Sequence, residues 1–508
     1  MKGRGLSGAL ALVLAASALP LTAGGAAAQV ALPGPQSISA SDKQTGAQAD
    51  PQLSADYGGA YAGAQSALVQ RIGVKVAAQS GIAQVDRDFS FKLLNSGVPN
   101  AFAIPGGYVY TTRGLLALMN NEAELAFVLG HETGHIAARH SDARQKVTQR
   151  NVLLGTLGQA VLGAVLGNGA IGQIGGQLGQ AGIQRLVVGN VMSHSRGDEF
   201  QADDLGVVYM QKAGYDASTS GDILGSLAAQ TALDARVTGN TRTTPGWAMS
   251  HPDPAARVTR AKQRAAQLGA MGGARNGDAF LLSLKGMVYG DDPAQGLIDG
   301  QEFRYPVGRL QFTAPAGYGM SNGSDVVTIS AAAGARVGGQ AQFTGGRYDG
   351  NLAGVVTRAF AALSKDAPAA VTPSQTTVNG MEAMTATVAA QSNGQAVDVT
   401  VVAIAAQAGM AYSFTVIQPQ GAGLGDLALL VSSFRRMSDA DAAAIRPRVI
   451  DVVSVGKADT VASLAARMAY PTLQAERFLV LNAIPAGTTR LAVGRKVKLV
   501  VWGPARKY

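Results

Sequence analysis

The chain has 508 residues, of which 47% are hydrophobic and 15% are charged, so it is long enough to form several domains with apolar cores. It contains no cysteine, which excludes disulfides, thiolate metal sites and cysteine nucleophiles. The formal net charge is +9, but the basic residues are scattered along the chain, so a nucleic acid is not an expected partner.

The first 28 residues have the pattern of a secretory signal peptide. Lys2 and Arg4 form a basic start, residues 6–21 are apolar, and three alanines at 26–28 offer a small-residue cleavage site. The apolar run is short for a membrane span, which needs about 20 residues. We therefore expect cleavage after Ala28 and export of the rest of the chain.

Residues 29–54 are rich in Ser, Gln, Gly and Pro and are predicted to be an exposed linker. The next segment, 55–270, has a mainly helical pattern, interrupted by strand character between positions 101 and 112. Within it, residues 151–184 carry no charged side chain and are dense in Gly, Gln and Leu. This stretch is predicted to be a mobile apolar flap or a packed helical hairpin. A membrane hairpin, with peripheral membrane association of the protein, is the alternative.

The pattern changes after a second predicted linker at 271–300. Asn-Gly pairs predict hairpin turns between strands at 322–323, 379–380 and 393–394. Residues 352–363 and 424–434 have the pattern of amphipathic helices. Residues 301–437 are therefore predicted to form an α+β domain, which resembles the small sandwich of PsbP- and Mog-like proteins. The sequence assigns this domain no role.

The strongest chemical signal is an HExxH motif that begins at His131 and ends at His135. It lies on a predicted helix that Asn121 caps, with Glu124 completing a capping box. Side chains four residues apart on a helix are separated by about 40° around its axis, so the two imidazoles face the same way. Two neutral imidazoles suit zinc, and Glu132 between them can reach a metal-bound water.

A catalytic zinc site needs a third ligand and an open position. Glu199 is the best candidate because it precedes Asp203 by four residues, so both carboxylates share one face of a helix. Glu199 would bind the metal, and Asp203 would accept a hydrogen bond from a ligand imidazole and fix its tautomer. An ordinary solvated acidic face is the alternative for this spacing alone.

All five histidines lie in the first half of the chain, so chemistry that uses imidazole is confined to the helical domain. His140 lies on the opposite side of a straight helix from His131, so it is predicted to be a surface residue and not a further ligand. His194 precedes the Glu199 segment and is expected either to orient that segment or to be exposed.

These motifs resemble metallopeptidase family 48, the HtpX- and BepA-type gluzincin zinc peptidases. The resemblance covers about residues 60–265 and is carried by four separated motifs in order: residues 100–107, the helix 121–140, the segment 195–203, and His251-Pro252 followed by Arg257. It implies one zinc ion per chain. The residues to which it assigns roles are the zinc ligands His131, His135 and Glu199, the general base Glu132, the oxyanion groups His251 and Arg257, and the substrate-binding edge strand Asn100, Ala101, Phe102 and Ala103.

Two roles are open to His251, which precedes a proline and is therefore expected in an extended or turn conformation. It would donate a hydrogen bond to the oxyanion beside Arg257, or it would occupy the fourth zinc position and exclude water. The first role predicts that removal of the imidazole lowers turnover. The second predicts a latent enzyme, in which the same change raises turnover.

The C-terminal segment 446–504 has the predicted order strand, helix, helix, strand, and it resembles a LysM module. The matching residues include Val453, Asp459-Thr460, Leu481-Asn482 and Gly494. The resemblance implies peptidoglycan as a partner. A small structural cap with the same fold is the alternative.

The expected fold is multidomain α+β, with a mainly helical gluzincin domain, a sandwich-like α+β domain and a small LysM-like βααβ domain. The expected function is that of a secreted periplasmic zinc metalloendopeptidase, which hydrolyses unfolded or misfolded envelope proteins bound along the edge strand. Two alternatives remain. One is a peptidoglycan-associated chaperone or adaptor with little proteolysis, and the other is a peptidoglycan peptide hydrolase.

Overall fold

The computed structural model describes residues 32–141, 194–238, 247, 251, 254–269, 272–323, 326–332, 335, 337–363, 371–392 and 395–506. Leu32–Tyr508 form one compact unit. The predicted signal peptide and the uncharged stretch 151–184 lie outside the described residues, and both predictions stay untested.

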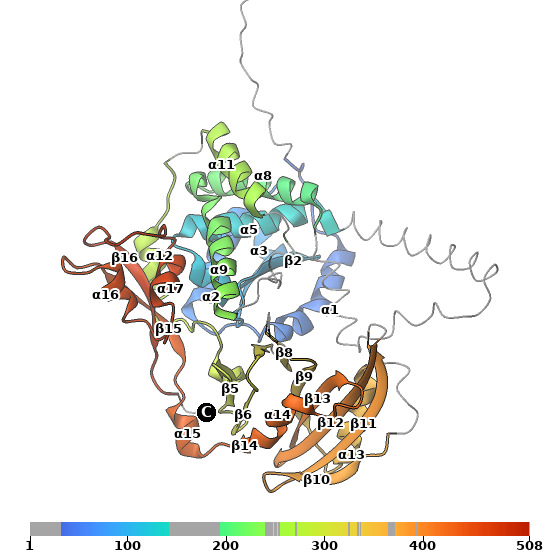
Figure 1. Ribbon diagram of the computed structural model, residues 1–508. Helices are drawn as coiled ribbons and strands as arrows, with labels where there is room; N and C mark the ends of the chain where they lie inside the picture. Colours follow the sequence, from blue (N-terminus) through green and yellow to red (C-terminus); the bar gives the residue numbers. More distant parts are fainter. Residues whose placement is uncertain are drawn as a thin grey trace, which may run out of the picture. The chain divides into compact units, whose positions relative to one another are not determined.

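Helices surround a small sheet in the first part of this unit (Figure 1). The helices are α1 Ala40–Asp56, α2 Ala64–Ala77, α3 Val85–Asp88, α4 Arg113–Leu118, α5 Glu122–Ala137, α8 Arg196–Lys212, η1 Ala217–Thr219, α9 Asp222–Thr238 and α11 Pro254–Gln267. The strands are β1 Ser90–Leu94, β2 Ala101–Ile104 and β3 Tyr108–Thr112. The strand order is β1-β3-β2, so β2 lies at an edge of this sheet and packs against α5.

Asn121 caps the central helix α5 as its sequence predicts, because its side chain accepts a hydrogen bond from the Glu124 backbone N–H. The predicted capping box is not formed, since the Glu124 side chain accepts from the Asn120 backbone N–H instead of that of Asn121. It crosses α8 closely where two glycines meet. A Cβ on Gly206 would lie 2.9 Å from the backbone nitrogen of His131, and one on Gly130 would lie 3.2 Å from Gly206. The absence of side chains at this crossing lets α8 bring its carboxylates beside the HExxH motif.

The predicted linker at 29–54 is wrong for residues 40–54, which belong to α1. Ser39 caps this helix, and Leu53 is buried in a cluster with residues of β2 and β3. Lys92 of β1 forms an ion pair with Asp50 at 2.6 Å. Only two residues of α1 are buried, so the helix has no strong apolar period, and contacts with the sheet stabilise it instead.

The predicted α+β character of the middle segment is confirmed. Its strands are β4 Leu297–Asp299, β5 Glu302–Tyr305, β6 Leu310–Thr313, β7 Tyr318–Asn322, β8 Val326–Ala331, β9 Gln340–Arg347, β10 Ser374–Val378, β11 Met381–Ser392, β12 Gln395–Gln407, β13 Met410–Pro419 and β14 Arg435–Arg436. They form a four-stranded sheet, β14-β6-β5-β4, and a seven-stranded sheet, β10-β11-β12-β13-β9-β8-β7. Helix α13 Leu352–Leu363 occupies the predicted range and packs on β12, while η3 Gly425–Leu427 and α14 Ala428–Ser433 fill the second predicted helix.

The C-terminal segment has the predicted order of elements. These are β15 Arg448–Ser454, α16 Val461–Ala465, α17 Gln474–Leu481 and β16 Lys496–Trp502, preceded by α15 Asp439–Ala444. The predicted linker at 271–300 contains α12 Gly277–Ser283, η2 Pro293–Gln295 and β4. Its residues 286–289 also bond to β15, since Ile450 N–H donates to the Met287 carbonyl at 2.9 Å. This segment is therefore structured and belongs in part to the C-terminal domain.

A buried lysine ties β16 to the segment before α5. Lys498 is fully buried, and its Nζ donates to the carbonyls of Ala117 at 2.7 Å and Met119 at 2.6 Å. Burial lowers the pKa of Lys498 to about 7 and raises that of nearby Glu124 to about 7. The C-terminal domain therefore contributes a polar contact to the start of the HExxH helix.

Lys498→Met is expected to destabilise the protein, because two buried carbonyls lose their donor at a cost of about 1–3 kcal/mol each. The free energy of unfolding from a denaturant titration measures this. Lys496→Met is the matched control on the same strand. Lys496 pairs with the exposed Asp278, and loss of such a surface pair costs about 1 kcal/mol or less. Equal stability of the two variants would contradict the prediction.

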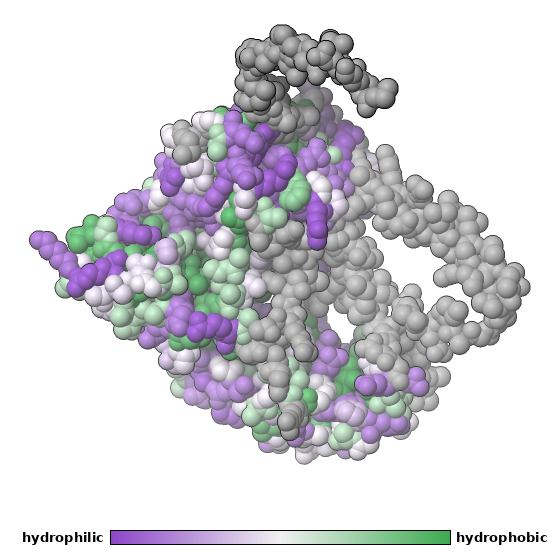
Figure 2. All heavy atoms as spheres, turned by 45° about the horizontal axis from the view of Figure 1, so that its top comes forward, coloured by the Kyte–Doolittle hydropathy of each residue, from purple (hydrophilic) through white to green (hydrophobic). Residues whose placement is uncertain are grey.

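Hydrophilic residues predominate on the upper part of the face shown in Figure 2. Among the described residues, no helix combines the length and the apolar character needed to cross a bilayer.

Candidate metal centre

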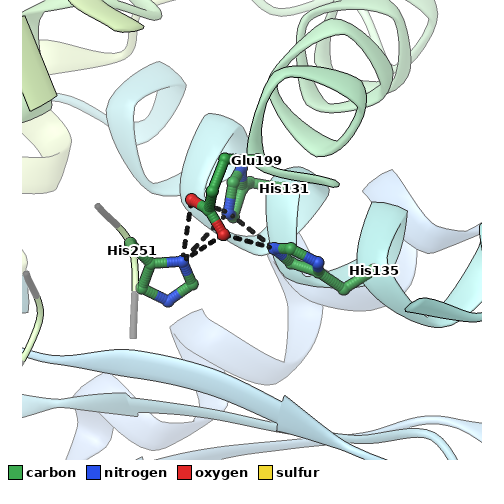
Figure 3. A group of neighbouring side chains, drawn as sticks. All are labelled: His131, His135, Glu199 and His251. Atoms are coloured by element: carbon green, nitrogen blue, oxygen red, sulfur yellow. Dashed lines mark hydrogen bonds and ion pairs between the residues drawn. The ribbon is translucent and has the colours of Figure 1, made fainter. Parts of the chain in front are cut away.

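Four side chains from three parts of the chain converge beside β2 (Figure 3). His131 and His135 come from α5, Glu199 comes from the first turn of α8, and His251 lies three residues before α11. All four are buried, with exposed fractions between 0% and 7%. The structure thus brings the three predicted ligands together and adds His251 to them.

The spacing of the four ligand atoms fits a single metal ion. His131 Nε2 lies 3.0 Å from His135 Nε2, 3.6 Å from Glu199 Oε2 and 3.4 Å from His251 Nδ1. Glu199 lies 3.4 Å from His135 Nε2 and 3.1 Å from His251 Nδ1. Bonds of about 2.0–2.1 Å at tetrahedral angles would place zinc ligands about 3.3 Å apart. Three imidazoles and one carboxylate are also donors that zinc accepts.

Charged groups behind the cluster hold its ligands in place. Asp203 Oδ1 lies 2.9 Å from His131 Nδ1, as the predicted tautomer-fixing role requires. Arg257 binds Asp203 with two hydrogen bonds, of 2.8 and 2.7 Å. Burial raises the pKa of Asp203, but the charge and hydrogen bonds of Arg257 outweigh burial and leave that pKa lowered. Asp203 is therefore held as a carboxylate facing the ligand imidazole.

The structure places Arg257 on carboxylates. In addition to its bonds with Asp203, its Nη1 lies 2.8 Å from Glu199 Oε2. Asp203 and Glu199 thus already pair with the guanidinium group. The predicted contact of Arg257 with the oxyanion stays a prediction. Burial raises the pKa of Glu199, but the charge of His251 and the hydrogen bond with His135 outweigh it, so that pKa is lowered.

Glu132 lies beside the cluster without joining it. It is 2% exposed, and its Oε1 lies 3.5 Å from His251 Nε2. Its Oε2 has no hydrogen-bond partner among the described residues, although it is buried. Burial raises the pKa of this carboxyl group, which makes it a stronger base than an exposed glutamate. A base with a free oxygen next to a metal-binding cluster suits proton abstraction from a water molecule.

His251 bridges the cluster and the edge strand. Its Nδ1 occupies the fourth corner of the ligand set, and its Nε2 lies 3.2 Å from the Ala101 carbonyl oxygen. Burial lowers the pKa of His251, but Glu199 and Glu132 outweigh burial and raise it to about 9, so a metal would have to displace a proton to bind Nδ1. Of the two predicted roles, this geometry favours the blocking ligand over the oxyanion donor.

The predicted substrate-binding residues divide into two groups. Asn100 accepts a backbone hydrogen bond from Thr112, and Phe102 is buried against Tyr110. Because alternate residues of a strand direct their backbone groups to opposite sides, Ala101 and Ala103 present theirs at the free edge of β2. Asn100 and Phe102 therefore support the strand, and the two alanines offer it to a ligand.

Two pockets flank the ligand cluster along β2. The first is lined by Ala103, His135 and residues 36–38. The second is lined by Ala101, Glu132 and His251, together with an apolar wall of Leu115, Phe127, Val128, Ile223, Leu224, Leu227 and Trp247. An extended chain added to β2 would thus have a pocket on each side of the cluster.

The prediction that His140 is a surface residue is wrong, since it is 4% exposed and its Nδ1 lies 2.8 Å from His135 Nδ1. Helix α5 ends at Ala137, and Arg139 has a left-handed backbone, with φ of 56°, that turns His140 back toward His135. The surface position follows only if the helix continues straight to residue 140, and no glycine in the sequence signals this turn. His194 stacks on His135, with ring centroids 3.6 Å apart, so it also lies at the cluster.

Comparisons with known proteins match the part of the chain that contains this cluster. The model of peptidase family M48 matches residues 64–265. The chain is 32% identical over 183 residues to the beta-barrel assembly-enhancing protease of Yersinia pestis, and the match covers 35% of each chain. It is 31% identical over 152 residues to a mitochondrial metalloendopeptidase of Schizosaccharomyces pombe, covering 30% of this chain and 41% of that one.

These matches span only a part of each protein, about a third of the assembly-enhancing protease. A solved structure of cyanobacterial PsbP from Synechocystis covers 28% of this chain and 98% of its own, at 10% identity and a TM-score of 0.22. A similarity this low supports no conclusion about the fold.

Proposed function

We propose, from the match of residues 64–265 to the model of peptidase family M48, that this chain is a zinc-dependent endopeptidase. The observation that carries the proposal is the buried set His131, His135 and Glu199, with Glu132 beside it. We further propose that it acts in the periplasm, on unfolded or misfolded envelope polypeptides, and that residues 446–504 bind peptidoglycan.

In this mechanism zinc, when bound, polarises the scissile carbonyl and acidifies water. Glu132 accepts the proton of the attacking water through Oε2, which has no hydrogen-bond partner in the described part of the chain. Asp203 orients the imidazole of His131, and Arg257 holds Asp203 and Glu199 as carboxylates. The free edge of β2 binds the substrate main chain at Ala101 and Ala103. Binding through the main chain depends little on the substrate's side chains, so it suits unfolded polypeptides of varied sequence.

The described conformation corresponds to a latent state in this proposal. His251 takes the fourth ligand position, where the substrate carbonyl and water would have to enter. Nε2 of the same imidazole contacts the Ala101 carbonyl oxygen at the free edge of β2, where a substrate strand would pair. Both the metal position and the strand must therefore be cleared before a substrate binds.

His251→Ala is expected to raise turnover. If the open form makes up about 1–10% of the molecules, removal of the imidazole raises turnover about 10–100-fold, because the whole population becomes competent. Casein hydrolysis by the wild type and by His251→Ala, with the zinc content of both measured in parallel, tests this. A chelator should abolish both activities, and added zinc should restore them.

A loss of turnover in His251→Ala at full zinc occupancy would instead assign the imidazole to the oxyanion. Activity that survives complete removal of the metal would refute the zinc peptidase itself. Digestion of purified sacculi beside casein separates this function from peptidoglycan peptide hydrolysis, for which only sacculi would be cut.

A further inference from the structure

We infer that His140 is a positioning residue that fixes the tautomer and orientation of the ligand His135, with Gln201 holding His140 in turn. The inference rests on the proposed function only in that a metal binds the cluster. It gives a role to a buried histidine that lies outside the four-residue ligand set.

The contacts form a continuous chain from the cluster to α8. His135 directs Nε2 toward the other ligands, 3.0 Å from His131 Nε2, and directs Nδ1 toward His140. The two Nδ1 atoms lie 2.8 Å apart, and His140 Nε2 lies 3.1 Å from Gln201 Oε1. Each of these distances suits a hydrogen bond.

Only one arrangement of protons satisfies this chain when a metal is bound. A metal on His135 Nε2 leaves the proton on Nδ1, which must then donate to His140 Nδ1. His140 is thereby the tautomer with its proton on Nε2, which donates to the Gln201 amide oxygen. Gln201 Oε1, together with Asp198 Oδ1 at 3.8 Å from the same nitrogen, thus favours the form of His140 that accepts from His135.

The backbone is shaped to produce this contact. Arg139, which is not a glycine, takes a left-handed conformation directly after α5 and turns the chain back. Gln36 holds the turn from outside, because its Nε2 donates to the Ala137 carbonyl at 2.7 Å and its Oε1 accepts from Arg139 Nε at 3.1 Å. A turn held at both ends indicates a required position for His140.

Helix α8 serves both imidazole ligands. Glu199 joins the cluster, Asp203 faces His131 Nδ1, and Gln201 between them reaches His140. His131 is therefore backed by a carboxylate, whereas His135 is backed by a neutral imidazole. Loss of an outer partner of a metal ligand lowers metal affinity about 10–100-fold.

The test compares zinc affinity, from chelator competition, and the absorption spectrum of the cobalt-substituted protein. His140→Leu is expected to lower zinc affinity about 10–100-fold and to alter the cobalt spectrum. His140→Asn is expected to recover most of both, because its amide oxygen can stand in for the accepting Nδ1. Gln201→Ala should cause a smaller loss in the same direction.

Gln211→Ala is the matched control, since Gln211 lies on the same helix and bonds to the Leu268 carbonyl, away from the cluster. It should match the wild type. If His140→Leu fails to fold, His140→Asn and Gln201→Ala decide the question. Wild-type affinity and spectrum in a folded His140→Leu protein would overturn the inference.

Two further outcomes distinguish the alternatives. His194 also lies beside His135 and His140, so a second metal could bind these three histidines. Loss of a second zinc equivalent in His140→Leu, with the tight site unchanged, would overturn the positioning role. A wild-type protein that binds zinc tightly but cuts no polypeptide would refute the proposed function and leave this inference intact.

Discussion

Glu132→Gln is expected to keep its metal and to lose about a hundred- to ten-thousand-fold in turnover, the usual contribution of a general base. The amide has the shape of the carboxyl group but cannot take a proton from water. The native carboxylate is buried, its pKa is raised by burial, and its Oε2 has no partner among the described residues. Initial rates of casein cleavage, with zinc measured in the same samples, give the result.

Glu124→Gln is the matched control for this change. Glu124 lies on the same helix, and the side-chain oxygen of a glutamine can still accept the hydrogen bond from the Asn120 backbone N–H. The control should retain wild-type rates and metal content. Turnover at the wild-type rate in Glu132→Gln would show that another group accepts the proton.

Glu199→Ala is expected to strip the metal. Loss of an outer partner costs about 10–100-fold in affinity, so loss of a direct ligand should cost more. The variant also leaves Arg257 Nη1, now 2.8 Å from Glu199, facing the imidazoles without its carboxylate. Zinc per chain after dialysis against a weak chelator, together with casein cleavage, measures the effect.

Asp198→Asn is the control for Glu199→Ala, because Asp198 is the neighbouring acid and accepts a bond from the Ser195 backbone that an amide oxygen can also accept. It should keep zinc. Full zinc occupancy in Glu199→Ala would show that the carboxylate is not a ligand.

Local spacing was sufficient to predict the inner part of the site. His131 and His135 are four residues apart, as are Glu199 and Asp203, and a helix converts this spacing into a shared face. The structure brings both pairs together, because two glycines at the crossing let the helices approach. The α+β middle segment was likewise predictable from hairpin turns and from the apolar period of residues 352–363.

The outer part of the site depends on tertiary contacts that local patterns do not encode. The position of His140 depends on a left-handed Arg139, a conformation that arginine does not signal. The partners of Arg257 depend on how α11 packs on α8. Helix α1 was missed for a similar reason, since its contacts with the sheet stabilise it and its own sequence lacks a clear period.

In the proposed latent state, the two contacts of His251 would make substrate binding and activation a single linked equilibrium. Nδ1 faces the ligand cluster and Nε2 contacts the Ala101 carbonyl. A substrate strand that pairs with this carbonyl would therefore displace the imidazole from the strand and from the cluster together. By thermodynamic reciprocity, the closed position of His251 weakens strand pairing by the same free energy by which strand pairing weakens the closed position. A folded protein has few unpaired backbone groups to offer, whereas an unfolded segment has many. Discrimination between folded and unfolded polypeptides would then arise from backbone availability alone, without any sensor outside the site.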